Sequence, residues 1–443
     1  MRFLKSGVVL AHLCFSWTVS ASIPFMIVCS KGEISKDKKK ETEAFLMWKE
    51  SGYDGDVSCK DTSGWQKISI KHRGNSSMKF AKKQYGFKIL DEEGNKTKVA
   101  LGDFPKNSNW VMRSPYIDRS LIRDGLAYNL GRDLGKQRGD DYAAPRTEFI
   151  EFAINGDYKG IFVLTEKIQH GRHHVPIQKA DASDLDHLTY IAEISSQKYD
   201  FKSKRGTMIR FNDPNEKKLK KLAEKDPYAA QELRKRIKNE INHFERVLLS
   251  DDFADPERGY RALVDFDSFV DYFIIQELSK NIDGFRRSEF FYKAKDGKFH
   301  MGPYWDFDIA FGNLSFYGMA KTKGWSHTKH WSYLRNAFWF NRLLKDPYFA
   351  QGVHRRYAEL REEGNLLSWA NLETRIDSMQ TRLGDAPERD RLRWDGTHKF
   401  TQRHIMNTKK RSEDLQGNVD ILKQWVQERL KWLDSQMGLN GEY

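Results

Sequence analysis

The chain has 443 residues and a formal net charge of +13, and aromatic side chains make up 13% of it. This length is enough for a sizeable hydrophobic core spread over two or three lobes. The aromatic content excludes an intrinsically disordered chain, because disordered sequences lack the apolar groups that build a core. The positive charge favours anionic partners such as nucleotides, acidic peptides or phospholipid, without choosing among them.

The N-terminus reads as a secretory leader. Two basic residues precede an apolar run over 8–19, and "VSA" offers a cleavage site ending near Ala21. A membrane span over 8–29 is the competing interpretation, but serines and a proline interrupt that run. We expect residues 1–21 to be a signal peptide. The mature protein would then be secreted, periplasmic or on the cell surface, with no transmembrane span after leader removal.

Two cysteines, Cys29 and Cys59, remain after the leader. They could form one disulfide in an oxidising compartment. The sequence holds no Cys/His spacing typical of structural zinc.

The first half of the mature chain alternates in the manner of strands. "WQKISIKHRGNSS" leads into "KKQYGFKIL", and "EFIEFAINGDYKGIFVLTEKI" predicts a hairpin around Asn155 and Gly156. Between them, "YIDRSLIRDGLAYNLGRDLG" predicts a helix with Asp118 as N-cap and Gly135 as its end.

From about residue 215 onward, helical patterns dominate. An amphipathic charged stretch covers 215–249, an apolar helix covers 264–284, and further helices fall near Leu343, Ala358 and Leu372 and over 418–437. The chain therefore predicts an α+β protein that is one domain over 22–443. A strand-rich N-lobe would span about 22–167 and a mostly helical C-lobe about 168–443.

Carboxylates stand out in two places. Asp283 follows the apolar helix in "NIDG", and Asp306 and Asp308 lie in "PYWDFDIAFGN". As a strand, the second segment would point both aspartates one way and its aromatic residues the other. Like charges on one face repel unless a cation or hydrogen bonds hold them. A turn with solvated acids is the simpler alternative.

The order of these carboxylates suits phosphoryl transfer. One carboxylate accepts the proton of an attacking hydroxyl, and another holds Mg²⁺ against phosphates. A short hairpin separates Asp283 from Asp306, as it does in protein kinases. Kinases place a second metal-binding Asn five residues after the catalytic aspartate, where this chain has Ser288, whose oxygen could also bind Mg²⁺.

Phosphate-binding candidates come from the N-terminal half. Arg73, Ser76 and Ser77 lie in a short glycine-containing loop that could approach phosphate or could be a plain hairpin turn. Strand alternation places Lys83 on an apolar face, where it needs an anion unless it snorkels to water.

Two further features are ambiguous. Glu166, on the face of Phe162 and Leu164, would position the nucleotide or form a structural ion pair. "HGRHH" at 170–174 suggests metal binding, although a solvated loop is the better interpretation.

Six motifs occur together in one order: "RGNSS", "KKQYGFKIL", "DRSLIRDGLAYNL", "INGDYKGIFVLTEKI", "NIDG" and "WDFDIAFG". In this the chain resembles the spore coat protein H (CotH) kinase family. The resemblance implies an atypical protein-kinase-like bilobal fold that uses ATP and Mg²⁺ or Mn²⁺ to phosphorylate serine in an exported or surface protein.

The resemblance also assigns roles to particular residues. It implies that Asp283 is catalytic, that Asp306 binds metal with help from Ser288 and Asp308, and that Lys83 and Glu166 serve the nucleotide. We expect a nucleotide and a protein as partners, and no nucleic acid. Two alternatives stay open: a surface adhesin on a kinase scaffold, and a phosphotransferase acting on a small molecule.

Overall fold

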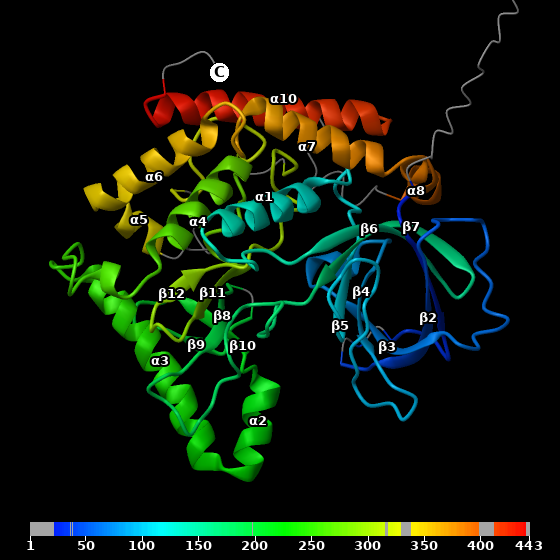
Figure 1. Ribbon diagram of the computed structural model, residues 1–443, viewed down its shortest axis with the longest axis horizontal. Helices are drawn as coiled ribbons and strands as arrows, with labels where there is room; N and C mark the ends of the chain where they lie inside the picture. Colours follow the sequence, from blue (N-terminus) through cyan, green and yellow to red (C-terminus); the bar gives the residue numbers. More distant parts are fainter. Residues whose placement is uncertain are drawn as a thin grey trace, which may run out of the picture.

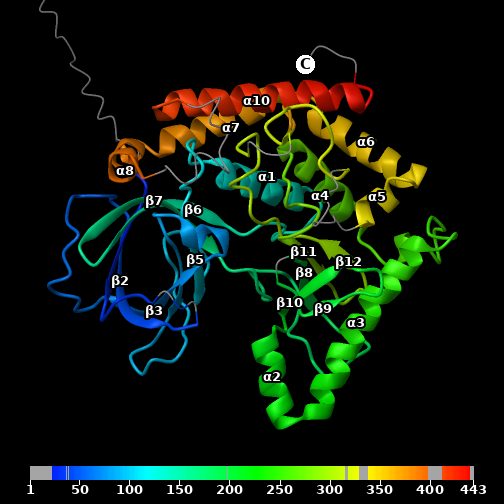
Figure 2. The same ribbon diagram turned by 180° about the vertical axis from the view of Figure 1, so that it is seen from behind.

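The computed structural model describes residues 22–35, 37, 39–196, 198–314, 318–328, 338–397 and 412–439. The expected leader, 1–21, lies outside the described residues. A strand barrel forms one side of the molecule, and a larger region of helices around a second sheet forms the other (Figure 1). The view from behind shows the same division (Figure 2). The expected α+β class, with strands first and helices later, is confirmed.

The barrel contains seven strands: β1 (Phe25–Ser30), β2 (Thr42–Lys49), β3 (Gln66–Arg73), β4 (Gln84–Ile89), β5 (Asn109–Arg113), β6 (Thr147–Ile154) and β7 (Asp157–Glu166). Their order is β1-β2-β3-β4-β5-β7-β6, and parallel pairing of β1 with β6 closes the barrel. Alternate residues such as Ile70, Phe87 and Met112 fill its interior, so the residues between them face outward.

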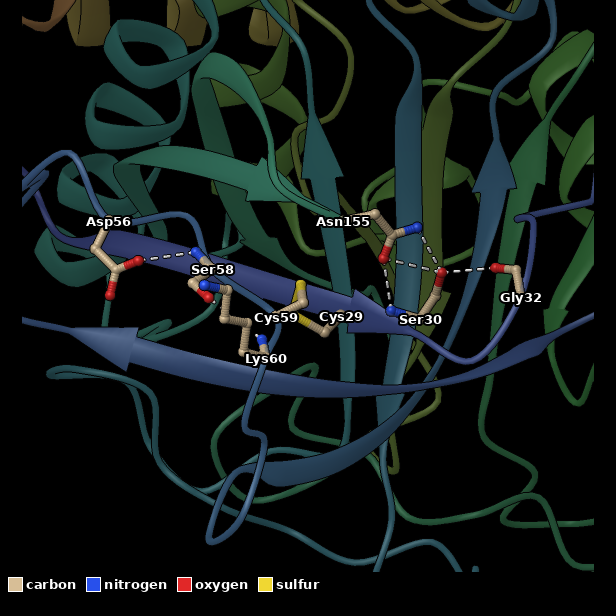
Figure 3. Close-up of a disulfide and its surroundings, with 8 residues drawn as sticks. All are labelled: Cys29, Ser30, Gly32, Asp56, Ser58, Cys59, Lys60 and Asn155. Carbon is tan, nitrogen blue, oxygen red and sulfur yellow. Dashed lines mark hydrogen bonds between the residues drawn. A yellow bond between two sulfur atoms is a disulfide. The ribbon is translucent and has the colours of Figure 1, made fainter.

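The predicted β6–β7 hairpin is confirmed. Asn155 and Gly156 form its turn with φ of 53° and 77°, the positive values that a tight two-residue hairpin requires. The Asn155 side chain accepts a hydrogen bond from Ser30 N at 2.8 Å, which ties the turn to the end of β1 (Figure 3). On the neighbouring part of β1, Cys29 is disulfide-bonded to Cys59, with their Cα atoms 5.7 Å apart (Figure 3).

Helix α1 (Arg123–Gln137) begins later and ends later than the sequence predicts. Asp118 is not its N-cap; its carboxylate accepts from Arg123 N at 2.9 Å and organises the turn before the helix. Gly135 lies inside the helix. A Cβ there would sit 2.4 Å from the Asp140 carbonyl oxygen, so this glycine permits a close approach of the following loop and does not end the helix.

The second region is built on a five-stranded sheet of order β12-β11-β8-β10-β9. Its strands are β8 (Tyr190–Ile194), β9 (Phe201–Lys202), β10 (Met208–Asp213), β11 (Glu289–Lys293) and β12 (Phe299–Met301). The sequence predicted the β11–β12 hairpin but not the three strands before it. The C-terminal part is therefore less purely helical than expected.

The helices after α1 are α2 (Glu216–Lys225), α3 (Pro227–Leu249), α4 (Phe266–Ser279), α5 (Trp339–Leu343), α6 (Pro347–Arg361), α7 (Trp369–Arg382), α8 (Ala386–Trp394) and α10 (Leu415–Gln436). Helix α8 packs against β7 of the barrel. Single 3₁₀ turns cover Ser76–Lys79 and Tyr260–Ala262. The apolar α4 is the central helix, packed against α1, α6, α10 and β12. Within the described residues, no helix has both the length and the apolarity needed to cross a membrane.

Candidate functional site

A cavity of about 500 Å³ lies between the outer face of the barrel and the loops of the second region. Strands β3, β4 and β5 form one wall, and segments around 193–212, 282–290 and 305–314 form the other. Seven predicted site residues line it: Arg73, Ser76, Ser77, Asp283, Ser288, Asp306 and Asp308. The cavity thus brings together residues separated by more than half of the chain.

The barrel wall is organised in three transverse rows of outward-facing residues, set by the register of β3, β4 and β5. We call the end next to Asp306 the inner end of the cavity. From this inner end to the outer end, the rows are Arg73, Gln84 and Arg113; then Lys71, Gly86 and Val111; then Ser69, Lys88 and Asn109. The inner row is basic, the middle row is small and apolar apart from its lysine, and the outer row is polar. Along about four residues of β3, the side chains of this wall therefore change from basic through small and apolar to polar.

Arg113 fixes the inner end of the cavity. Its Nη2 donates to Asp306 Oδ1 at 2.6 Å, and its Nε donates to Asp124 Oδ2 at 2.7 Å. The other oxygen of Asp124 accepts from Phe307 N at 2.8 Å. One buried arginine therefore joins the barrel, α1 and the segment that carries the aspartates. Burial alone would raise the pKa of Asp306, but the charge and hydrogen bond of Arg113 outweigh it and lower that pKa.

Asp306 sits in a strained turn and not in the predicted strand. Strand β12 ends at Met301, and Asp306 has φ of 73°, a left-handed conformation that few non-glycine residues adopt. Tyr128 Oη accepts from Asp306 N at 3.1 Å, and Ser288 Oγ donates to Asp306 Oδ2 at 3.2 Å. Trp305 does not point away from the aspartates, as strand alternation predicted, but lines the cavity together with them.

Asp308 is a cavity carboxylate to whose side chain no described residue donates a hydrogen bond. Burial, followed by the negative charges of Asp306 and Asp124, raises the pKa of Asp308 well above its usual range. A bound cation would remove this repulsion.

Asp283 is buried on the loop after α4. Arg286 Nη2 donates to its Oδ1 at 2.8 Å, and Arg287 Nε lies 3.3 Å from the same oxygen. Its backbone N–H donates to Asn281 Oδ1 at 3.1 Å. Burial raises the pKa of Asp283 although the two arginines oppose the shift. The result is a positioned carboxyl group with increased proton affinity.

Lys83 does not line the cavity. It precedes the first residue of β4, Gln84, so strand alternation does not extend to it, and its Nζ donates to the Met78 carbonyl oxygen at 2.7 Å. The buried lysine is its neighbour Lys82, which is 1% exposed and ion-paired with Asp390 of α8.

Glu166 also lies away from the cavity lining. It is fully buried at the end of β7 and accepts from Arg146 N at 3.0 Å, with Arg146 Nη1 at 3.3 Å. His174 Nδ1 stands 3.8 Å from its other oxygen. This is the structural ion pair that the sequence left as the alternative.

The histidine-rich segment is only partly the solvated loop that we expected: Arg172 and His173 are exposed, but His174 is buried and His170 bonds the Asp213 carboxylate. Across the described ranges, no group of three or more His, Cys, Asp or Glu side chains is arranged to hold a metal ion. Magnesium at nucleotide sites needs only one or two carboxylates, since phosphates and water complete its shell.

Sequence reasoning missed Arg113, Asp124 and the arginine pair that holds Asp283. A weak signal existed for Arg113, because alternation in "NWVMR" puts it on the face of Asn109 and Val111. Its partners come from α1 and from the segment near 306, and the sequence gives no sign of those contacts.

A family model described as CotH kinase protein matches residues 70–433. The match covers most of the chain, so the chain belongs to this family, as the six ordered motifs indicated. It begins in β3, ends in α10 and includes every cavity-lining residue except Glu41 and Ser69. A search of curated proteins finds no significant match to this chain.

Proposed function

We propose that the chain is an exported protein kinase that uses ATP and Mg²⁺, or Mn²⁺, to phosphorylate a hydroxyl group, that of serine, in a secreted or surface protein. The observation that carries the proposal is the meeting of Asp283, Asp306 and Asp308 in one cavity opposite Arg73 and Arg113. Membership of the CotH kinase family supports a kinase-like activity. An atypical kinase-like bilobal fold is part of the proposal.

The residues at the inner end of the cavity fit a divalent cation. Asp306 and Asp308 supply hard oxygen ligands, Ser288 lies beside Asp306, and Asp308 has no donor among the described residues. These three residues would hold the ion. A bound Mg²⁺ would neutralise the negative charge that shifts between phosphate oxygens during the transfer.

The inner row and the loop after β3 would bind the phosphates. The Arg73 guanidinium lies 5.7 Å from the Trp305 ring centroid, which orients it toward the cavity. Burial and the nearby Arg113 lower the pKa of Arg73 to about 10, so it stays protonated at neutral pH. Gly74 has φ of 103°, and a Cβ there would lie 2.0 Å from Ser77 Oγ, so only glycine lets the loop fold back.

The middle row would accept the nucleoside. Gly86 and Val111 are neighbours in register and present little side-chain bulk. A flat, apolar floor of this kind suits a nucleobase, whose faces are apolar.

Asp283 would accept the proton of the acceptor hydroxyl. A raised pKa brings a carboxylate closer to the proton affinity that a general base needs. Arg286 and Arg287 hold one of its oxygens and so fix the direction of the carboxylate.

Export is supported by the leader pattern and by the Cys29–Cys59 disulfide, because such bonds persist in oxidising compartments. A mature N-terminus near Ala21, found by mass spectrometry of protein recovered outside the cytoplasm, tests this part of the proposal. An intact Met1 on a soluble cytoplasmic product contradicts it.

A binding protein without turnover is the second candidate. Asp306 and Asp283 are each already ion-paired with arginine, and such pairing competes with metal and proton transfer. Incubation of the mature protein with labelled ATP and Mg²⁺ or Mn²⁺ decides between the two. Kinase activity predicts label on a protein hydroxyl, lost in Asp306→Asn; no labelling with either metal favours the binding protein.

A further inference from the structure

The outer end of the cavity carries lysines that the triphosphate of the proposed nucleotide would not contact. Lys88 lies in the outer row, and Lys71 points from the middle row toward the same end. Lys167 follows β7 and donates its N–H to the Asn109 carbonyl oxygen at 3.4 Å, so it stands beside the outer row. All three side chains line the cavity.

Two more lysines extend this group beyond the cavity wall. Lys96 lies in the turn after β4, bridged to Leu90, and Lys218 lies in the first turn of α2. Helix α2 and α3 form the hairpin that projects from the body of the molecule (Figure 1). We call these five residues, Lys71, Lys88, Lys96, Lys167 and Lys218, the outer lysine cluster.

Carboxylates balance only part of the cluster. Glu41 binds both Lys71, at 3.0 Å, and Lys88, while Asp213 binds Lys218 at 2.6 Å. Within the described part of the chain, no carboxylate forms an ion pair with Lys96 or Lys167. The cluster therefore has more positive charges than its own acidic partners neutralise.

The lysines are close enough to repel one another. Desolvation by the surrounding protein, with the charges of Lys71, Lys96, Arg73 and Lys218, lowers the pKa of Lys167 to about 8, although the residue keeps an exposed surface. Desolvation, with the charges of Lys88 and Lys218, also lowers the pKa of the exposed Lys96. The contacts of Lys218 agree with this, because Asp213, which binds it, also bonds His170, three residues after Lys167. A cluster of like charges is stabilised when an anion binds among them.

The nucleotide does not supply that anion. Its charge resides in the triphosphate, which the inner row and the aspartates would hold. The inner and outer rows are four residues apart on β3, about 13 Å at a strand rise of 3.3 Å per residue. The nucleobase and ribose, which would lie on the middle row, are uncharged, so the anion must belong to another ligand.

We propose that the outer lysine cluster binds an acidic segment of the protein that is phosphorylated. This inference rests on the proposed function, since it names the class of acceptor. The chemistry is charge complementarity between lysine ammonium groups and runs of Asp or Glu. An extended peptide covers about 13 Å in four residues, so the acidic run begins four or more positions from the acceptor serine.

Peptide binding tests the inference directly. A fluorescein-labelled peptide with one serine followed, four positions later, by four glutamates is titrated into the full mature protein without nucleotide, and anisotropy is measured. A peptide with glutamines in place of the glutamates is the matched control. We expect binding of the acidic peptide to be at least ten-fold tighter and to weaken steeply with salt.

The protein variants are Lys96→Glu/Lys167→Glu and, as a control, Lys345→Glu, which changes an exposed lysine after α5. The double variant should lose at least ten-fold in affinity for the acidic peptide, and the control should stay within two-fold. Equal binding of the two peptides, or equal affinity in both variants, overturns the inference. So does lysine-dependent binding to phosphatidylserine vesicles without binding to the peptide.

Asp306→Asn separates this inference from the proposed function. That variant should bind the acidic peptide as the unmodified protein does, while phosphorylating nothing. If the unmodified protein binds the acidic peptide but transfers no phosphate, the kinase function fails and the acidic binding site stands. If it phosphorylates acidic and glutamine peptides equally well, only the acidic preference fails.

Discussion

The barrel carries two pairs of basic residues, both at the ends of its strands β3 to β5, but the surroundings of the two pairs differ. Arg73 and Arg113 end β3 and β5, the two strands that flank β4, and face the cavity, where Arg113 contacts Asp306. Lys82 and Lys83 precede β4, between those strands, and neither lines the cavity. Lys82 instead bonds Asp390 of α8, and Lys83 bonds the Met78 carbonyl oxygen.

The difference shows that strand register, and not residue type, decides which cation serves the cavity. Residues inside β3 and β5 inherit a defined outward direction from pairing with β4. Residues just before β4 lie outside the ladder, so their direction follows local turns. Both arginines are therefore expected to act on ligands, Arg113 on the fold as well, and the lysines on the fold alone.

Replacement of Arg113 should give the largest effect, because it changes both the cavity and the fold. Arg113→Met leaves Asp124 buried without its partner, which should lower the free energy of unfolding by about 3–5 kcal/mol. Urea denaturation measures the loss. Arg113→Lys keeps the positive charge but not the paired hydrogen bonds to Asp124 and Asp306, so its free energy of unfolding should lie between those of Arg113→Met and the unmodified protein. An unchanged free energy of unfolding in Arg113→Met would contradict the idea that Arg113 joins the barrel to α1 and to the segment around Asp306.

Lys82→Met should destabilise the fold by a similar amount, about 3–5 kcal/mol, because Asp390 loses its buried partner. Asp390 also accepts from Ile161 N at 2.7 Å, so the pair attaches α8 to β7. The double variant Lys82→Met/Asp390→Leu should recover part of the loss in the same denaturation experiment. Full additivity of the two single changes would mean that the pair is not coupled.

Arg73→Ala should weaken binding of Mg·ATP about ten-fold, equivalent to about 1.4 kcal/mol. The free energy of unfolding should fall by no more than about 2 kcal/mol, because the alanine removes a cation–π interaction with the Trp305 ring, which is worth about that much at a desolvated site. Calorimetric titration measures the affinity. Unaltered affinity would remove Arg73 from the phosphate site.

Lys83→Ala should have the smallest effect. Its side chain makes one hydrogen bond to a backbone carbonyl, worth about 1 kcal/mol, and we expect Mg·ATP affinity within two-fold of the unmodified protein. The same titration provides the comparison. A ten-fold loss would restore Lys83 as the nucleotide lysine and would break the distinction between the two pairs.

Local patterns predicted one side of the site well. Asp283, Ser288, Asp306 and Asp308 all reach the cavity, because short loops after an apolar helix and a hairpin constrain them. The reason given for Asp306 was nevertheless wrong, since a left-handed turn and not a strand directs it.

The barrel side and the sheet of the second region were harder to predict. Arg113 is fixed by partners on α1 and near 306, and Glu166 by Arg146, and none of these contacts leaves a periodic signal. Strands β8 to β10 were missed because each has only two to six residues, and because β8 pairs with β11, which lies far along the chain.

The most direct test is calorimetric titration of Mg·ATP into the unmodified protein, Asp283→Ala and Asp306→Asn. We assign Asp306 to the metal and phosphates and Asp283 to the acceptor hydroxyl. Asp283→Ala should therefore keep Mg·ATP affinity within a few-fold, while Asp306→Asn should lose at least ten-fold, in a magnesium-dependent manner. Equal affinity in all three proteins, or no binding by the unmodified protein, would contradict the claim that this cavity is a metal–nucleotide site.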